Sequence, residues 1–284
     1  MVSENIIIQS VNIQGMSQMK KYEIERMIEK REAHGTVLTG LVETHLKEDR
    51  YSWDEKWKIY EERRDQEDKK GGGLLLIHTD REYIKMEKIE SKHRDMLAIR
   101  GTIRSRKIIV VLVYMATGNT QASRERNNKI TESIREVLDN NKEEYGVILL
   151  GDLNGHLGHL GTQQENENGR RIKRIAGEHN LVIANLDDRC EGETTWSRGG
   201  MKSTIDYIMI DRKLMEIYQK MIIDEDQIQW ELSDHNLIEA VFVISPTIKW
   251  RRDDKIDEVV YWRFDNENIQ NYVNEFFTFL PKSY

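Results

Sequence analysis

Short apolar runs that end in polar residues recur along the chain. The run at 147–150 lies between Gly146 and Gly151 and is followed by an acid and an amide, Asp152 and Asn154. Four consecutive apolar residues between glycines predict a short, fully buried strand. Acids and amides after a strand also form ordinary turns, because their side chains cap their own backbone. The run therefore predicts a buried strand whose polar end is either a turn or a functional site.

The same reading along the chain predicts about ten or more strands and three or four helices. Apolar positions at helical spacing indicate helices at 17–35, where Ser17 is the expected N-cap, and at 122–141 and 169–179. Strands are expected at 5–12, 36–42, 74–78, 83–89, 96–103, 107–114, 147–150, 181–185, 194–197, 203–210, 229–233 and 237–244. Because the helices do not alternate strictly with the strands, two packed sheets flanked by helices are favoured over a doubly wound parallel sheet.

Composition limits the class of protein. The chain has 284 residues, of which 38% are hydrophobic and 33% charged, as in a soluble globular protein with a heavily charged surface. We expect one large domain over 1–245 and a tail over 246–284 with a helix near 266–279. No apolar run approaches the roughly 18 residues that span a bilayer. The single cysteine, Cys190, excludes an internal disulfide and fits a reducing compartment.

The net charge of −7 argues mildly against a protein that holds nucleic acid by bulk electrostatics. Basic clusters nevertheless occur at 100–107, 170–174 and 249–252. Such a cluster is more often a solvated face than a binding patch. The charge pattern therefore leaves a nucleic-acid partner open.

Polar residues of one chemical type end several apolar segments. These are Asn12, Glu43, Tyr114, Asp152 with Asn154, Asp206, and Asp234 with His235. Oxygen ligands of this kind suit Mg²⁺, which is usually held by one or two carboxylates together with water and substrate phosphate. A histidine with a nearby carboxylate, and a further acid, suit acid–base work on a phosphodiester. So many such endings in one chain indicate a site rather than turns alone.

In this order the motifs resemble the endonuclease/exonuclease/phosphatase superfamily. Their order and spacing are most similar to the endonuclease domain of non-long-terminal-repeat (LINE-type) retrotransposons. The resemblance rests on NIQG at 12–15, ETHL at 43–46, Tyr114, GDLN at 151–154, TW at 195–196 with IDYI at 205–208, and SDH at 233–235. It implies a four-layered α/β sandwich of the DNase I-like kind, which agrees with the elements predicted above.

The resemblance also implies a role for each matching residue. Glu43 would be the main ligand of Mg²⁺, for which Mn²⁺ could substitute, with Asn12 and Asp234 nearby. Asp152 would orient or deprotonate the attacking water. The metal and the water would thus be held by residues that follow separate strands.

The remaining matches would act on the phosphate. Asn154 and Tyr114 would hold the scissile phosphate, and His235 would stabilise its charge or assist the leaving group. Asp206 would hydrogen-bond His235. Further phosphate contacts are implied at Thr195 and Ser203.

The implied activity is a Mg²⁺-dependent endonuclease that nicks one strand of double-stranded DNA and leaves a 3′-hydroxyl for target-primed reverse transcription. Its partners would be the DNA and the reverse transcriptase domain of the parent element, toward which the tail at 246–284 would lead. Its compartment would be the nucleus, with the cytoplasm as a second location, and no membrane is expected.

Two alternatives stay open. One is an abasic-site repair nuclease or a phosphatase of the same fold, and the other is a catalytically silent binding module. Gln14 stands where abasic-site repair enzymes carry an acid, which argues against the repair activity and against a second metal position. His156 and His159 have a His-x-x-His spacing, but no cysteine or acid pattern completes a zinc site, so a role in the loop is favoured.

Overall fold

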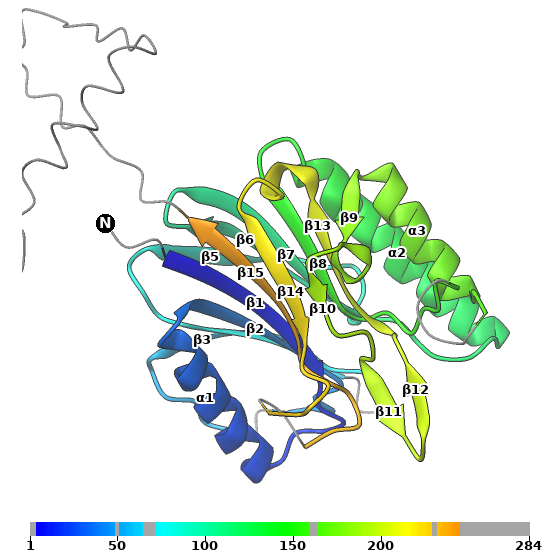
Figure 1. Cartoon of the computed structure of the whole chain (residues 1–284), viewed down its shortest axis with the longest axis horizontal. Helices are drawn as coiled ribbons and strands as arrows, with labels where there is room; N and C mark the ends of the chain where they lie inside the picture. The colour runs from blue at the N-terminus through cyan, green and yellow to red at the C-terminus, as the bar shows by residue number, and fades with distance from the viewer. Residues whose placement is uncertain (1–3, 49–50, 65–71, 159–163, 229–231, 245–284) are drawn as a thin grey trace, which may run out of the picture. The chain divides into compact units, whose positions relative to one another are not determined.

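The computed structural model describes residues 4–48, 51–64, 72–158, 164–228 and 232–244. Two large β-sheets lie face to face, and helices cover their outer faces (Figure 1). The helices are α1 (Gln18–Glu32), α2 (Gln121–Asn141) and α3 (Glu167–Glu178), with short 3-10 turns η1 (Ala184–Leu186) and η2 (Arg212–Leu214).

The first sheet has seven strands in the order β10-β14-β15-β1-β2-β4-β3. Its strands are β1 (Glu4–Asn12), β2 (Gly35–Val42), β3 (Trp57–Glu62), β4 (Leu74–Thr79), β10 (Cys190–Glu191), β14 (Tyr218–Ile223) and β15 (Ile238–Ile244). β1 pairs parallel to β2 and antiparallel to β15, so the sheet is mixed.

The second sheet has six strands in the order β5-β6-β7-β8-β13-β9. They are β5 (Ile84–Ile89), β6 (Met96–Ile103), β7 (Arg106–Tyr114), β8 (Gly146–Asp152), β9 (Leu181–Ile183) and β13 (Asp206–Asp211). β7 and β8 are parallel and β13 is antiparallel to β8, which makes this sheet mixed as well. A separate hairpin is formed by β11 (Trp196–Arg198) and β12 (Met201–Ser203).

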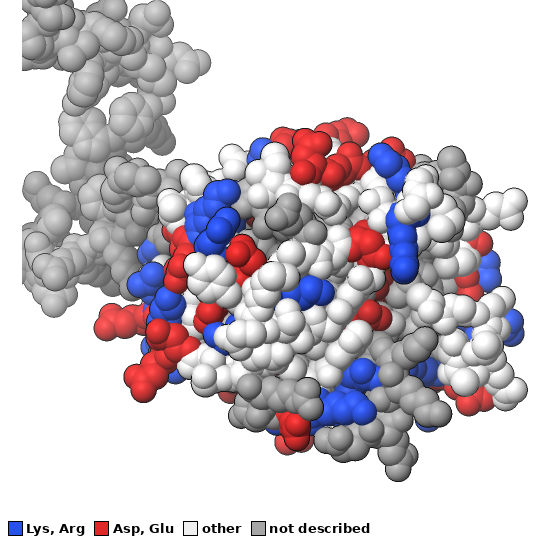
Figure 2. All heavy atoms as spheres, turned by 90° about the horizontal axis from the view of Figure 1, so that it is seen from below, with Lys and Arg blue, Asp and Glu red and all other residues white. Residues whose placement is uncertain are grey.

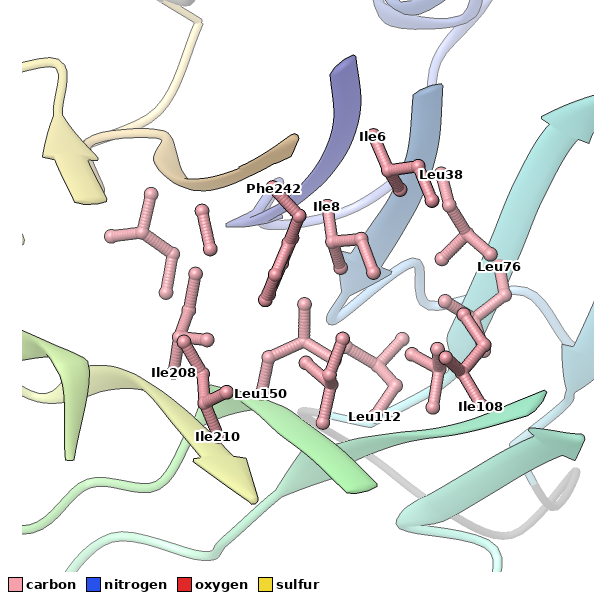
Figure 3. Packing of buried hydrophobic residues seen from close by; sticks show 14 of the residues in the cluster. Ile6, Ile8, Leu38, Leu76, Ile108, Leu112, Leu150, Ile208, Ile210 and Phe242 are labelled. Atoms are coloured by element: carbon pink, nitrogen blue, oxygen red, sulfur yellow. The ribbon is translucent and has the colours of Figure 1, made fainter. Parts of the chain in front are cut away.

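The main hydrophobic core fills the space between the two sheets. Figure 3 shows Ile8 and Leu38 of one sheet facing Leu112 and Leu150 of the other. A second core lies between the six-stranded sheet and helices α2 and α3, and a third between the seven-stranded sheet and α1. Helix, sheet, sheet and helix therefore make four layers, and the predicted α/β sandwich is confirmed.

Most predicted elements lie within a few residues of the observed ones. Ser17 caps α1, and its side chain accepts a hydrogen bond from the backbone N–H of Lys20. Strand β3 was not predicted, because this edge strand has one buried residue, Trp57, and no alternation marked it. Strand β14 was also missed. Residues 229–231 of one predicted strand, and the predicted tail at 246–284, lie outside the described residues.

None of the described helices combines the length and the apolar character that crossing a membrane requires. The longest of them, α2, carries its buried residues along one side and charged residues elsewhere. This pattern is that of a helix packed on a sheet.

His78 makes the stability of this sandwich depend on pH. The ring is 2% exposed in β4, with Nδ1 at 2.8 Å from the carbonyl oxygen of Thr79 and Nε2 at 3.4 Å from the hydroxyl of Tyr60. In the neutral tautomer Nδ1–H donates to Thr79, while the one hydroxyl hydrogen of Tyr60 is shared between Nε2 and the carbonyl oxygen of Met86, which lies 3.1 Å from the hydroxyl oxygen. Burial lowers the pKa of His78 below its ordinary value of 6.5. The folded protein thus resists protonation of this ring.

We expect the His78 contribution to be complete above pH 6.5 and to be lost as the pH falls below that value, because the unfolded chain then binds a proton that the folded chain refuses. Urea unfolding at pH 7.5 and 5.5 measures the effect. A His78→Gln variant should lose less free energy of unfolding between the two pH values than the parent protein does. Equal losses would contradict the assignment.

Candidate active site

The side chains of four strand-end residues point into the space between the two sheets. In β8, Ile148 and Leu150 face the main core while Leu149 faces α2 and α3, so Asp152 shares the inner direction. The same alternation applies to Asn12, Tyr114 and Asp206 at the ends of β1, β7 and β13. In register, Tyr114 is the partner of Asp152, and Asp152 is the partner of Asp206. Period-two alternation thus gathers acids, an amide and a phenol at one edge of the sandwich.

A hydrogen bond between the sheets joins this group. Asn12 Nδ2 donates to Asp152 Oδ2 at 2.9 Å, and Asn12 Oδ1 accepts from the backbone N–H of Gln14 at 3.0 Å. Both side chains are 2% exposed. The amide of Asn12 therefore fixes Oδ2 of Asp152, while the backbone N–H of Asn154 donates to Oδ1 at 3.1 Å, so both carboxylate oxygens are oriented.

Gly151 allows β8 to deliver Asp152. Its φ is +132°, and a Cβ would lie 2.1 Å from the carbonyl oxygen of Val113 on the neighbouring strand. Only glycine fits so close to a paired backbone. This contact explains why the GDLN motif has a glycine at position 151, independently of the chemistry of Asp152.

Asp206 and His235 form a buried pair. His235 Nδ1 lies 2.9 Å from Asp206 Oδ2 and 3.2 Å from Oδ1, and the two residues are 4% and 3% exposed. Burial alone would lower the pKa of His235, but the charge and hydrogen bond of Asp206, and the charge of Asp152, raise it to about 9. His235 is therefore a cation at neutral pH, with its Nδ1–H committed to Asp206.

The loop that carries His235 is tied to the first strand. Ser233 Oγ donates to the carbonyl oxygen of Asn12 at 2.7 Å and accepts from the backbone N–H of His235 at 3.2 Å. His235 also pairs with Trp196 of β11 as an isolated bridge. The serine of the SDH motif thus positions the histidine relative to Asn12.

Asp152 and Glu43 differ in their electrostatic surroundings. Burial, and then the charge of Asp206, raise the pKa of Asp152 to about 7. Burial also opposes ionisation of Glu43, but the interactions with His45, whose Nε2 lies 3.7 Å from Oε2, and with Tyr114 outweigh it and lower the pKa of Glu43. Asp152 can therefore exchange a proton near neutral pH, whereas Glu43 stays ionised.

Glu43 reaches the site through an unusual backbone. The chain continues to pair beyond β1 and β2, with Ile13 N–H donating to Val42 and Gly15 N–H donating to the carbonyl oxygen of Glu43 at 2.7 Å. Glu43 itself has a φ of +53°, and Gln14 opposite it has a φ of +48°. Non-glycine residues rarely adopt this conformation, and they do so most often at functional sites.

These strand ends enclose a pocket of about 350 Å³. Of the ten predicted site residues, seven line it: Asn12, Glu43, Tyr114, Asp152, Asn154, Ser203 and His235. Asp206 stands behind His235, as expected of a residue that hydrogen-bonds it. The structure therefore brings together residues that lie as much as 223 positions apart in the sequence, from Asn12 to His235.

Besides Asp206, two further predicted residues do not line the pocket. Thr195 is 0% exposed, and its Oγ1 accepts from the backbone N–H groups of Ile205 and Asp206 at 2.9 and 3.0 Å. In this structure its hydroxyl is enclosed and positions the backbone of Asp206, and the expected phosphate contact of Thr195 stays a prediction. Asp234 lies beside the pocket, where its Oδ1 accepts from Gln14 Nε2 at 2.5 Å and stands 3.9 Å from His235 Nε2.

The donor atoms suit a hard cation. Among the described residues, ligand atoms of Asp152, Asp206 and His235 lie within 4.8 Å of one another. Glu43, the expected main ligand, is outside this group but lines the same pocket with an ionised carboxylate. Because Asp206 is engaged with His235, the oxygens of Glu43 and Asp152 offer the better-matched pair for Mg²⁺, which prefers carboxylates and water.

Several supporting residues gave no signal at the level of motifs. Thr117 lines the pocket three residues after Tyr114. Asn168 Nδ2 and Asn166 Nδ2 both donate to the carbonyl oxygen of Asn154, at 3.3 and 3.0 Å. The only hint in the sequence was a run of amide side chains at the start of α3. This hint was weak, because asparagine at this point is also an ordinary helix cap.

Comparison with known proteins places this site in context. Residues 108–239 match the sequence profile of a family described as endonuclease-reverse transcriptase. Among solved structures, the endonuclease domain of TRAS1, a telomere-specific non-LTR retrotransposon, aligns with a TM-score of 0.63 and 16% identity over 84% of this chain and 98% of its own. The resemblance to the endonuclease/exonuclease/phosphatase superfamily is confirmed. A search of curated proteins gave no match.

Other superfamily structures show the same fold. The AP endonuclease LMAP from Leishmania major aligns with a TM-score of 0.67 and 15% identity, covering 85% of this chain and 89% of its own. The 3′ phosphatase NExo from Neisseria, bound to a product DNA hairpin, aligns with a TM-score of 0.62 and 15% identity, covering 83% and 98%. This chain thus shares the fold of these solved structures.

Proposed function

We propose that this chain is a Mg²⁺-dependent DNA endonuclease that hydrolyses a phosphodiester in one strand and leaves a 3′-hydroxyl. The observation that carries the proposal is the pocket in which Glu43, Asp152 and the Asp206–His235 pair converge from both sheets. A buried cationic histidine beside two acids of opposite pKa shift suits hydrolysis of an anionic ester.

Each residue then has a chemical task. Glu43 would hold the ion, with Asn12 and Asp234 nearby, and the amide of Asn12 fixes Oδ2 of Asp152. When bound, the ion neutralises charge on the phosphate oxygens. Asp152 receives a proton from the attacking water, which its raised pKa favours. The water oxygen would bond to phosphorus as the P–O3′ bond breaks, and His235 would direct its Nε2–H toward the phosphate charge and supply the proton that the leaving 3′-oxygen needs.

Asn154 and Tyr114 complete the contact with the scissile phosphate. Asn154 Nδ2 donates to the carbonyl oxygen of Met115 at 2.8 Å, so one hydrogen of its amide is left for the substrate. Burial, and then the charge of Glu43, raise the pKa of Tyr114, so its hydroxyl stays protonated, and its one hydrogen, which interacts with Glu43 in this structure, would turn to the phosphate when substrate binds. Neither group adds negative charge next to the phosphate.

Local contacts rather than a broad basic surface would bind the DNA. Figure 2 shows lysine and arginine side chains interspersed with aspartate and glutamate over one face of the molecule. The net charge of −7 fits this pattern. Binding should accordingly depend on salt less steeply than it does for a protein with many phosphate-contacting cations.

The nicked strand would prime reverse transcription by the parent element. This part of the proposal is supported by the match to an endonuclease-reverse transcriptase family and by the likeness to a retrotransposon endonuclease domain. The reverse transcriptase domain of that element is the proposed partner. Work on target DNA would place the protein in the nucleus.

The likeness to an AP endonuclease favours a second candidate, cleavage at abasic sites. Gln14 argues against it, because its amide occupies Asp234 where a repair enzyme would present an acid. We therefore expect an undamaged duplex to be cut at least as fast as the same duplex with one abasic analogue. Simple phosphate monoesters should be hydrolysed far more slowly than either.

Initial rates on end-labelled duplexes test this choice, and extension of the nicked strand by a DNA polymerase reports the 3′-hydroxyl. Strong preference for the abasic duplex would establish the repair activity instead. Turnover of monoesters alone would indicate a phosphatase. Binding of DNA without turnover of any substrate would support the alternative that the chain is a catalytically silent binding module.

A further inference from the structure

Two buried asparagines connect the loops that carry several of the pocket residues. Asn127 lies in α2 and Asn168 lies in α3, and they are 1% and 7% exposed. Asparagine is a poor helix former, because its side chain competes for backbone hydrogen bonds. Here both side chains reach out of their helices to the loops that follow β7 and β8. Helix propensity therefore does not explain these two residues, and their contacts do.

Asn127 holds the loop after β7 at one residue, Ala116. The Oδ1 of Asn127 accepts from the backbone N–H of Ala116 at 2.9 Å, and its Nδ2 donates to the carbonyl oxygen of Ala116 at 2.9 Å. One side chain thereby fixes both backbone groups of Ala116. This residue lies between Tyr114 and Thr117, which both line the pocket.

Asn168 joins this loop to the loop after β8. Its Nδ2 donates to the carbonyl oxygens of Ala116 and Asn154, each at 3.3 Å. The side chain of Asn154 in turn donates to the carbonyl oxygen of Met115 at 2.8 Å. Asn154 is thus held at its backbone by Asn168, and at its side chain by the loop that Asn127 fixes.

Arg171 sets the orientation of both buried amides. A guanidinium group can only donate, and Arg171 Nη1 donates to Asn168 Oδ1 at 3.2 Å. Asn127 Nδ2 donates to the same oxygen at 2.9 Å. Turning either amide by 180° would place a nitrogen against a donor and an oxygen against a carbonyl oxygen. The network therefore has one arrangement, in which the N–H groups of Asn168 point at the two loops.

The backbone of Asn154 needs such support. Its φ is +45°, in the left-handed region that few residues other than glycine adopt. A residue in this region keeps its conformation only where surrounding contacts hold it. The bond from Asn168 to the carbonyl oxygen of Asn154 is one of these contacts. Its loss would free the peptide group after Asn154, and the side-chain amide would no longer be held at one position in the pocket.

We propose that Asn168, supported by Asn127, is a positioning residue that aims the amide of Asn154 at the scissile phosphate. Neither residue is among the described residues that line the pocket, so both act through Asn154 and not on the substrate. The inference rests on the proposed endonuclease function, in which Asn154 holds that phosphate. It gives the two buried asparagines no part in the proton transfers.

The first test measures kcat and KM for nicking of an end-labelled duplex by the parent protein, Asn168→Ala and Asn168→Asp. A misplacement of about 1 Å at the substrate costs up to about 10²-fold in rate, so Asn168→Ala should lower kcat/KM by about 10–100-fold. Aspartate has nearly the same size but no Nδ2 hydrogens, so Asn168→Asp should lose at least as much. A rate like that of the parent in Asn168→Asp would overturn the inference, because packing and not hydrogen bonding would then explain the alanine variant.

A double-variant cycle with Asn154→Gly tests whether Asn168 acts through Asn154. Glycine removes the side chain of Asn154 and adopts its positive φ without strain. Because the two residues are then no longer independent, Asn168→Ala should change kcat/KM by no more than about twofold in the Asn154→Gly background. The full loss in that background would overturn the inference, since Asn168 would then act by another route.

Asn141→Ala is the matched control. Asn141 is also buried in α2, where its Nδ2 donates to the carbonyl oxygen of Val137 at 2.7 Å. It lies 14 residues beyond Asn127 in the same helix, which is about 21 Å along the helix axis. Asn141→Ala should therefore lower the free energy of unfolding in urea, as Asn168→Ala does, and leave the rate of nicking unchanged.

Equal losses of rate in Asn141→Ala and Asn168→Ala would overturn the inference, because lost stability alone would then account for both. A folded parent protein that cuts no duplex would refute the proposed function and, with it, the inference. A parent protein that cuts, together with an Asn168→Ala variant that matches it, would refute the inference alone.

Discussion

Replacing His235 by alanine is expected to slow DNA nicking by about 10²–10⁴-fold, the usual cost of losing a group that acts on the reacting phosphate. The variant removes the only described cation that lines the pocket next to Asp152. Asp206 and Asp152 are then left as buried acids without their positive partner. The rate of conversion of supercoiled plasmid to the relaxed form measures the loss.

The Asp206→Asn variant distinguishes the contribution of the Asp206 charge from that of the His235 ring. The amide oxygen can still accept from His235 Nδ1–H, so the ring keeps its orientation and loses mainly the charge that raises its pKa. We expect a smaller loss than for His235→Ala, and a loss that grows as the pH rises, because the pKa of His235 falls once Asp206 is neutral. Equal losses at all pH values would contradict this division of roles.

The second large effect concerns stability. Arg31 at the end of α1 pairs with Glu239 of β15, with Arg31 Nε donating to Glu239 Oε2 at 2.8 Å and Nη2 donating to the other oxygen. The two side chains are 17% and 4% exposed. Arg31→Ala leaves a buried carboxylate without its partner and is expected to cost about 3–5 kcal/mol of the free energy of unfolding. Urea denaturation measures this value.

Arg26→Ala is the matched control, since its side chain is 68% exposed and lies 3.5 Å from Glu23. Exposed pairs contribute about 0–1 kcal/mol, so this variant should unfold close to the parent. A double variant, Arg31→Met with Glu239→Leu, should recover most of the loss, because no unpaired charge is left. Failure of the double variant to recover would show that packing of Arg31, rather than charge, holds the helix.

The positions of Asn12, Tyr114, Asp152 and Asp206 could be predicted because one physical rule governs them. Each continues the alternation of an apolar strand, so each faces the inner core side at the strand end. The strands themselves were readable for the same reason. The edge strand β3 was not, since four of its six residues are half-buried on one face or the other, which removes the alternation.

The pattern of apolar and polar positions along the sequence could not predict tertiary contacts. The sequence could not tell that Thr195 turns inward to hold the backbone of Asp206, because the same threonine on the outer side of the turn would suit a phosphate. It also gave no sign that His156 would meet Ser203, 47 residues later. A His-x-x-His spacing points to a metal or to a loop, and only the folded chain shows the serine.

Nicking of supercoiled plasmid by the purified protein, with Mg²⁺ and then with EDTA, tests the central claim most directly. We expect relaxed circles with Mg²⁺, no conversion after chelation, recovery when Mg²⁺ is restored, and no conversion by a folded Glu43→Ala variant. Relaxation that persists in EDTA or in the Glu43→Ala variant would contradict the metal site. Intact plasmid with a folded parent protein and Mg²⁺ would contradict the endonuclease itself.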